Sequence, residues 1–214
     1  MASGMKAAFI SIEGIEGCGK TTQTRMVSEY LEGKGISCIQ VREPGGTPIG
    51  EKIRDILLDP KNSMNVLTEA LLYFAARAQL VEEVIKPALK EGKWVVADRF
   101  SDSTLAYQGH AGGLGIEELG KLSNLIDPNQ IVPDLTLVLD LDIKEGLSRL
   151  EGVLDRIEIR ELEFHNKVRE AFKLLSKRSP EKIKLIDAEG KPEETFSKIK
   201  VHLDELIKRA KSEV

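Results

Sequence analysis

One nine-residue stretch near the N-terminus has residue types spaced for binding a nucleotide phosphate. Residues 14–22 read GIEGCGKTT and match the pattern G-x-x-x-x-G-K-[ST]. Glycines in such a loop turn backbone N–H groups toward an anion, Lys20 reaches the β- and γ-phosphates, and the Thr21 hydroxyl is placed for Mg²⁺. The stretch therefore predicts a site for ATP with Mg²⁺, formed by Gly14, Ile15, Glu16, Gly17, Cys18, Gly19, Lys20, Thr21 and Thr22. The alternative is a Gly-rich turn without a ligand.

Asp98 and Arg99 are a second pair of residues that could take part in chemistry, because they directly follow the short hydrophobic run 94–97. A carboxylate at the end of a strand can order Mg²⁺ or its waters, and the adjacent guanidinium can clamp a phosphate. The alternative is a solvent-exposed ion pair at a strand end. We expect Asp98 to share the metal with Thr21.

Two further groups have the spacing of one helical face. Tyr73 and Arg77 are four residues apart, as are Ser103 and Tyr107, and Gln108 follows Tyr107. A ring beside a guanidinium suits an aromatic base with a polar edge. The alternatives are a core aromatic next to a surface arginine and a polar helix end.

Three arginines, Arg149, Arg156 and Arg160, straddle a break at residues 151–153. A basic segment interrupted by glycine is typical of a mobile lid that closes on phosphates, here over about residues 148–160. The alternative is a solvated amphipathic helix, because acidic residues are interleaved with the arginines.

The elements that position these residues alternate between strand and helix. This order predicts an α/β fold with a mostly parallel sheet covered on both faces, and ligands in such sheets bind beyond the carboxyl ends of the strands. The strands are expected at 7–12, 37–41, 94–97, 135–141 and 183–186. The helices are expected at 21–32, 49–58, 66–89, 101–108, 116–125, 143–150, 154–177 and 192–211, with a glycine-rich loop at 109–115.

Bulk properties narrow the class of protein. The chain has 214 residues, 41% of them hydrophobic, which suits one large domain from which residues 1–4 are expected to be excluded. A formal net charge of −4 argues against a general nucleic-acid binder. Two cysteines suggest neither a disulfide scaffold nor a metal cluster, and no apolar run is long enough to span a membrane. A cytoplasmic location is the default expectation, and the three histidines are expected at the surface.

Spare arginines and a base-sized aromatic site point to two phosphorylated ligands facing each other, hence to phosphoryl transfer between nucleotides. At this point the motifs resemble the thymidylate kinase (dTMP kinase) family over nearly the whole chain. The resemblance rests on residues 12–22 (IEGIEGCGKTT), 42–47 (REPGGT), 75–77 (AAR), 98–103 (DRFSDS), 106–109 (AYQG) and 155–158 (DRIE).

The resemblance implies ATP-dependent phosphorylation of dTMP to dTDP with Mg²⁺, in dTTP synthesis. It also implies a P-loop three-layer α/β/α fold with a five-stranded parallel sheet and a short helical lid, and a homodimer. In the family pattern, Arg77 meets the thymine edge, Tyr73 stacks on the ring, and Arg54 and Arg99 hold the dTMP phosphate. The remaining contacts with dTMP are expected from Glu16 near the sugar and from Ser103, Tyr107 and Gln108 around the nucleoside.

On the donor side, the resemblance implies that residues 187–192, including Lys191, bracket adenine. The chain departs from the family pattern at two points. Tyr73 stands where phenylalanine is usual, and Gly17 stands where one subgroup carries a catalytic arginine. The other subgroup supplies its arginines from the lid, which favours Arg149 as the catalytic group together with Lys20, Asp98 and Arg99, and Arg156 on the ATP phosphates.

Other functions share part of this pattern. Another nucleoside or deoxynucleoside monophosphate kinase would have the same loop and the same Asp98-Arg99 pair. A P-loop switch or partition ATPase would bind partners instead, but no water-positioning residue or switch loop is recognisable. An inactive nucleotide-binding module is disfavoured by the intact Lys20 and Thr21.

Overall fold

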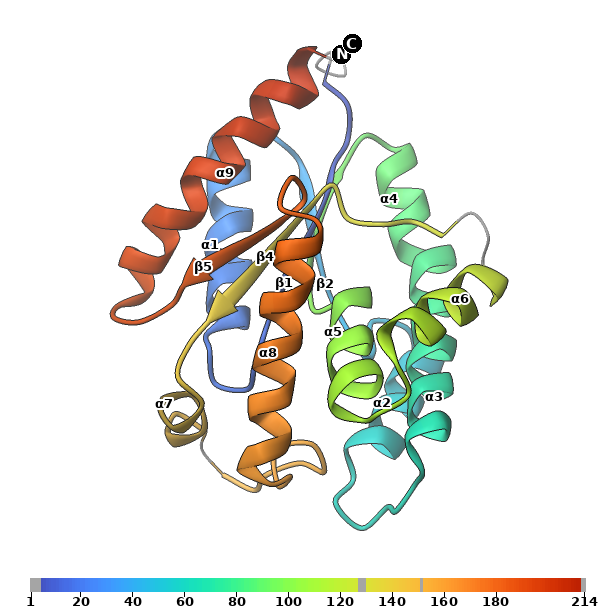
Figure 1. The fold of residues 1–214 in the computed structure, drawn as a ribbon. Helices are drawn as coiled ribbons and strands as arrows, with labels where there is room; N and C mark the ends of the chain where they lie inside the picture. The colour runs from blue at the N-terminus through green and yellow to red at the C-terminus, as the bar shows by residue number, and fades with distance from the viewer. Residues whose placement is uncertain (1–4, 127–129, 151, 213–214) are drawn as a thin grey trace.

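A five-stranded parallel sheet forms the centre of the molecule. The structure is a computed structural model that describes residues 5–126, 130–150 and 152–212. The predictions made for residues 1–4 and for Glu151 therefore lie outside the described residues. The sheet order is β2-β3-β1-β4-β5 (Figure 1). Its members are β1 (Phe9–Gly14), β2 (Cys38–Arg42), β3 (Trp94–Asp98), β4 (Leu135–Asp140) and β5 (Ile183–Asp187). The predicted α/β class and five parallel strands are therefore confirmed.

Helices cover both faces of this sheet. α1 (Lys20–Gly33) and α9 (Pro192–Ser212) pack together on one face, whereas α8 (Leu162–Arg178) packs on β4 and β5 on the other (Figure 1). The remaining helices are α2 (Pro48–Leu58), α3 (Val66–Leu80), α4 (Lys86–Lys90), α5 (Ser101–Thr104), α6 (Ile116–Ile126) and α7 (Ile143–Ser148), with π-helical turns η1 (Val81–Ile85) and η2 (Leu105–Ala111). In the described ranges, no helix is long and apolar enough to cross a membrane.

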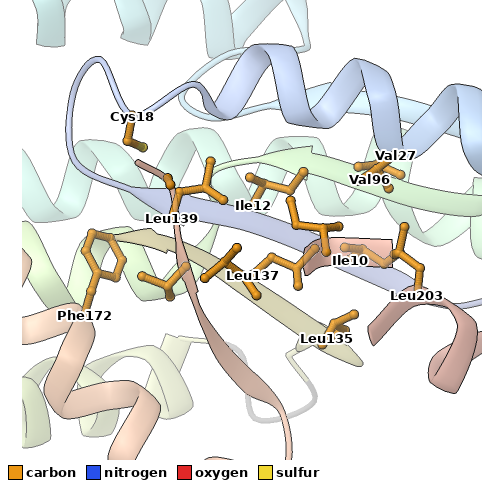
Figure 2. Packing of buried hydrophobic residues seen from close by; sticks show 14 of the residues in the cluster. Ile10, Ile12, Cys18, Val27, Val96, Leu135, Leu137, Leu139, Phe172 and Leu203 are labelled. Carbon is orange, nitrogen blue, oxygen red and sulfur yellow. The ribbon is translucent and has the colours of Figure 1, made fainter. Parts of the chain in front are cut away.

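Alternating side chains on the central strand anchor both layers. Ile10 and Ile12 lie in the apolar layer with Val27 of α1 and Leu203 of α9 (Figure 2). Phe9 points to the opposite face and meets Phe100 edge-on, with ring centroids 4.8 Å apart. Burying the two faces of β1 fixes the register of the strand, because a shift of one residue would exchange them.

The expected long helix over residues 66–89 is present as a continuous helical run, but with a change of winding. α3 gives way to η1 before α4 resumes at Lys86. Pro87 has no N–H to donate and its ring crowds the preceding turn, which accounts for the wider winding just before it. The predicted loop at 109–115 is shorter than expected, because η2 extends to Ala111.

The last-but-one helix was predicted to begin at Leu154, but α8 begins only at Leu162. A separate turn precedes it. The Asp155 carboxylate accepts hydrogen bonds from the backbone N–H groups of Ile157 and Glu158 at 2.8 and 2.9 Å, and Glu158 in turn accepts from the N–H of Asp155. This reciprocal pattern is a capping box. The Arg156 N–H also donates to the Leu58 carbonyl at the end of α2, which holds the turn away from the axis of α8.

Candidate active site

The predicted phosphate loop joins β1 to α1 at the carboxyl edge of the sheet. Gly14 has φ 140°, and a Cβ there would lie 2.6 Å from the Leu139 carbonyl oxygen and 2.7 Å from Cys18 Sγ. Only glycine fits here, where the end of β1 lies beside Leu139 of β4. The side chain of Lys20 folds back so that Nζ donates to the Ile15 carbonyl at 2.6 Å. The ammonium group therefore lies over the loop, where a triphosphate would bind.

Thr21 and Asp98 are brought together from the start of α1 and the end of β3. The Thr21 hydroxyl donates to Asp98 Oδ2 at 2.6 Å. Among the described residues, no group of three or more His, Cys, Asp or Glu side chains could hold a metal ion by itself. One carboxylate and one hydroxyl fit Mg²⁺ that arrives with a nucleotide, because this ion keeps waters and phosphate oxygens as its other ligands.

A donor cavity borders the loop, and three separate segments line it. α7 leads into Arg149 there, and Gln23 of α1 donates to the Pro192 carbonyl at 2.9 Å, tying the loop after β5 to the first helix. The guanidinium of Arg149 pairs with Glu145 at 2.5 Å. The lining residues are Gly17, Cys18, Gly19, Thr22, Gln23, Arg149, Ala188, Gly190, Lys191, Pro192 and Thr195.

An acceptor cavity borders the same loop, and Lys20, Thr21 and Asp98 of the phosphate site line it. Most of the residues predicted for the second substrate line it, although they come from four separate segments of the chain. These are Glu16, Arg54, Tyr73, Arg99, Ser103, Tyr107 and Gln108. Arg42, Glu43, Thr104 and Asp155 join them. A ligand in this cavity would therefore lie next to a phosphate bound by the loop.

Arg99 is the charged centre of the acceptor cavity. Its backbone has φ 70°, a left-handed conformation that is rare outside glycine and often found at functional sites. The guanidinium donates to Glu16 Oε1 and to the Gly14 carbonyl, both at 2.9 Å, and lies 5.0 Å from the centre of the Tyr107 ring. These contacts hold the cation in place before any phosphate binds.

Glu16 is buried in the loop and remains ionised. Burial alone would raise the pKa of this carboxyl, but Arg99, His165 and Lys20 together hold the pKa well below its usual range. Tyr107 donates its hydroxyl to Glu16 Oε1 at 2.6 Å, and His165 Nδ1 lies 3.2 Å from Oε2. The carboxylate therefore lines the cavity as a fixed acceptor of hydrogen bonds.

Comparison with known proteins identifies this architecture. The family model described as thymidylate kinase matches residues 12–199. The chain belongs to the thymidylate kinase family. It is 45% identical to the thymidylate kinase of Caldanaerobacter subterraneus subsp. tengcongensis over 97% of this chain and 100% of that one. It is 50% identical to that of a Thermoanaerobacter species over 86% of this chain and 90% of the relative.

A solved structure agrees with these sequence relatives. The thymidylate kinase of Ehrlichia chaffeensis matches with a TM-score of 0.73 and 33% identity, over 92% of this chain and 98% of that one. As a member of the thymidylate kinase family, the chain is an ATP-dependent nucleoside monophosphate kinase, and the resemblance seen in the sequence is confirmed.

Arg77, which the thymidylate kinase pattern assigns to the base edge, does not line the acceptor cavity. Its side chain is buried and its Nη2 lies 2.7 Å from Glu43 Oε2 and 2.8 Å from Thr104 Oγ1. Glu43 and Thr104 themselves line the cavity. In this conformation Arg77 thus stands behind the cavity wall and reaches it through these two partners.

Arg156 lies apart from the donor cavity, contrary to the prediction that it contacts the ATP phosphates. Its side chain is buried on the acceptor side, where Nη1 lies 2.7 Å from Glu69 Oε2 and Nε donates to the Leu57 carbonyl at 2.6 Å. The family resemblance gave Arg156 this role. In the structure, Arg156 lies in a turn that is tied to α2. Arg149 and Lys191, by contrast, both line the donor cavity.

Three buried titratable residues of this thymidylate kinase were not predicted. Glu13 accepts hydrogen bonds from the Phe100 N–H at 2.7 Å and from the Ser103 hydroxyl at 2.6 Å. Glu69 has no exposed surface, and His165, which was expected at the surface, is wholly buried beside Glu16. The sequence does contain a signal for the two glutamates, because each is a single acidic residue in an apolar stretch. Glu13 directly precedes Gly14, and Glu69 lies one helical turn before Tyr73.

Proposed function

We propose that this chain transfers the γ-phosphoryl group of ATP to the 5′-phosphate of dTMP, giving dTDP and ADP for dTTP synthesis. The observation that carries the proposal is that one cavity contains both the phosphate loop and a nucleoside-sized set of polar and aromatic side chains. Lys20 and Asp98 line it together with Tyr73 and Gln108. An ATPase that hydrolyses its nucleotide has no use for a second cavity of this kind.

On the acceptor side, Arg99 and Arg54 hold the dTMP phosphate. Arg54 donates to the Pro44 carbonyl at 2.9 Å and so faces the cavity from α2. Tyr73 stacks on the thymine ring, with Arg77 behind the wall at the base edge. Glu16 binds the sugar, and the nucleoside is enclosed by Ser103, Tyr107 and Gln108.

On the donor side, the backbone of residues 14–22 binds the triphosphate, and Lys191 with the loop after β5 borders adenine. Arg149 stabilises the charge on the transferring phosphoryl group, and residues 148–160 act as the lid. Support for Arg149 comes from its place on the wall of the donor cavity beside Gly17 and Gly19. An arginine in this role contributes up to several powers of ten in rate in other phosphoryl-transfer enzymes.

Thr21 and Asp98 would hold Mg²⁺, which neutralises charge on the β- and γ-phosphates when bound. The protein's own groups do the remaining work by positioning and by charge. Lys20, Arg99 and Arg149 are cationic donors that stabilise the negative charge as it moves between the two substrates. No general base is required, because a phosphate oxygen of dTMP is already anionic near neutral pH. Lid closure excludes water, which would otherwise accept the phosphoryl group.

We also propose that the chain is a homodimer located in the cytoplasm. An apolar face of α3 supports the dimer, since Leu67 and Leu71 are 49% and 45% exposed and Ala75 and Ala78 continue the same stripe. Light scattering after size exclusion tests this, and a monomeric mass at micromolar concentration rejects it. The two free thiols fit a reducing compartment.

The test of the reaction is ADP release by the purified chain, measured with ATP and Mg²⁺ in the presence and absence of dTMP. A kinase shows turnover that depends on dTMP and yields one dTDP for each ADP. Turnover that is equally fast without any monophosphate would reject transfer to dTMP and favour the ATPase alternative. Thr21→Val serves as a control, because it removes the hydroxyl beside Asp98 and must lower both products together.

A further inference from the structure

A buried carboxylate fixes the direction of the amide that faces the acceptor cavity. Gln108 of η2 lines this cavity and is 1% exposed, and its Nε2 donates to Glu69 Oε1 at 2.6 Å. Glu69 lies on α3, one turn before Tyr73, and has no exposed surface. A carboxylate accepts hydrogen bonds, so the amide nitrogen must be on its side. Gln108 Oε1 accepts no hydrogen bond from any residue in the described ranges, so this oxygen is left to accept one from a ligand.

The second oxygen of Glu69 is held by two cations. Oε2 lies 2.7 Å from Arg156 Nη1 and 2.6 Å from Arg160 Nη2, both from the turn that precedes α8. Guanidinium groups only donate, so this side of the carboxylate must stay an acceptor. Glu69 therefore has a divided role, in which Oε2 anchors the turn and Oε1 sets the orientation of Gln108.

We infer that Glu69 is a positioning residue that determines which pyrimidine the enzyme accepts, acting through Gln108. The inference rests on the proposed dTMP site. An amide oxygen turned to the base accepts the N3–H that thymine and uracil share. Cytosine has a lone pair at N3, which would face another lone pair. A buried polar group left unpaired in this way costs on the order of 1–3 kcal/mol, enough for roughly ten- to hundredfold discrimination.

Glu69→Gln reverses this arrangement without changing the size of the side chain. The two arginines retain the oxygen of the introduced amide, so its NH₂ group faces Gln108. Gln108 must then turn its own oxygen toward that NH₂ group and present its nitrogen to the base. The donor and acceptor pattern in the cavity is thereby inverted.

The experiment compares kcat/KM for dTMP, dUMP and dCMP between the wild-type enzyme and Glu69→Gln. We expect kcat/KM for dTMP to fall at least about tenfold and the dCMP to dTMP ratio to rise at least about tenfold. The dUMP to dTMP ratio stays constant, because both bases carry N3–H. An unchanged dCMP to dTMP ratio in a folded variant that phosphorylates dTMP would overturn the inference.

Two controls separate positioning from a general loosening of the site. Arg160→Gln removes a partner of Oε2 but leaves the bond between Oε1 and Gln108, so it must not raise the dCMP to dTMP ratio. The double variant Glu69→Gln with Gln108→Leu must have the same ratio as Gln108→Leu alone. A rise with Arg160→Gln, or a further effect in the double variant, counts against action through Gln108.

Folding is checked by the thermal unfolding midpoint of each variant. If Glu69→Gln does not fold, Glu69→Asp keeps the charge opposite the arginines but draws the carboxylate back from Gln108. It must raise the ratio in the same direction, and an unchanged ratio rejects the inference. Absence of any dTMP phosphorylation by the wild-type enzyme would instead reject the proposed function.

Discussion

Gly17 of the phosphate loop and Gly146 of α7 lie in direct contact. A Cβ on Gly17 would lie 1.8 Å from the Gly146 carbonyl oxygen, and a Cβ on Gly146 would lie 2.6 Å from the Glu16 carbonyl oxygen. α7 can rest on the loop only because both side chains are absent. Arg149 follows the last turn of α7, so the glycine contact places its guanidinium at the donor cavity. The loop position without a side chain and the lid arginine are therefore parts of one arrangement.

Gly146→Ala should displace α7 from the loop and misplace Arg149. We expect kcat to fall roughly tenfold and the free energy of unfolding to fall by about 1–3 kcal/mol, the usual cost of overpacking. The matched control is Gly120→Ala in α6, where a Cβ meets nothing within 4 Å. That variant should keep wild-type kcat and gain slightly in stability. Equal kcat for both variants would show that the contact does not position Arg149.

Arg149→Ala should lower kcat by roughly a hundredfold or more, with KM for ATP and dTMP changed only a few-fold, because its charge is needed chiefly in the transition state. Steady-state kinetics with both substrates check this. Arg25→Ala is a matched control, because Arg25 forms the same kind of exposed pair with a glutamate four residues away, at 2.7 Å. Near-normal turnover of Arg149→Ala would move the catalytic role to another cation.

Arg99→Ala should abolish transfer to dTMP and leave ATP affinity within about threefold of wild type. The physical reason is that Arg99 faces the acceptor cavity, whereas Lys20 lies over the phosphate loop. Removing a buried cation from Glu16 should also lower the free energy of unfolding by roughly 3 kcal/mol. Calorimetric titration with a non-hydrolysable ATP analogue and with dTMP separates the two sites. Lost ATP affinity with normal dTMP binding would contradict the assignment.

Glu13 should make stability depend on pH. Burial, with a contribution from Asp102, raises the pKa of Glu13 from about 4.5 to about 7. A raised pKa means that the folded state binds the proton more tightly than the unfolded state. The stabilisation is complete below pH 4.5 and is lost as pH rises through 7, by on the order of 3 kcal/mol in total. Glu13→Gln, which mimics the protonated form, should unfold at a less pH-dependent temperature between pH 5 and 8. Identical pH profiles for the two proteins would refute the role of Glu13.

Sequence patterns were sufficient where the chemistry is local. Residues 14–22 and the Asp98-Arg99 pair could be predicted because loop glycines, strand ends and neighbouring charges are set within a few residues. Two features could not be predicted from local sequence patterns. The turn at residues 155–160 replaces a helix because Arg156 is tied to α2, nearly a hundred residues earlier. The environments of Glu69 and His165 depend on partners from distant segments, so their burial follows only from the packed fold.

We propose above all that the phosphate loop serves a dTMP site. A panel of dTMP, dUMP, dCMP, AMP and GMP, each offered with ATP and Mg²⁺, tests it most directly through kcat/KM. We expect the highest kcat/KM for dTMP, a lower one for dUMP, and weak or no reaction with the other three. A higher kcat/KM for any monophosphate other than dTMP would contradict it.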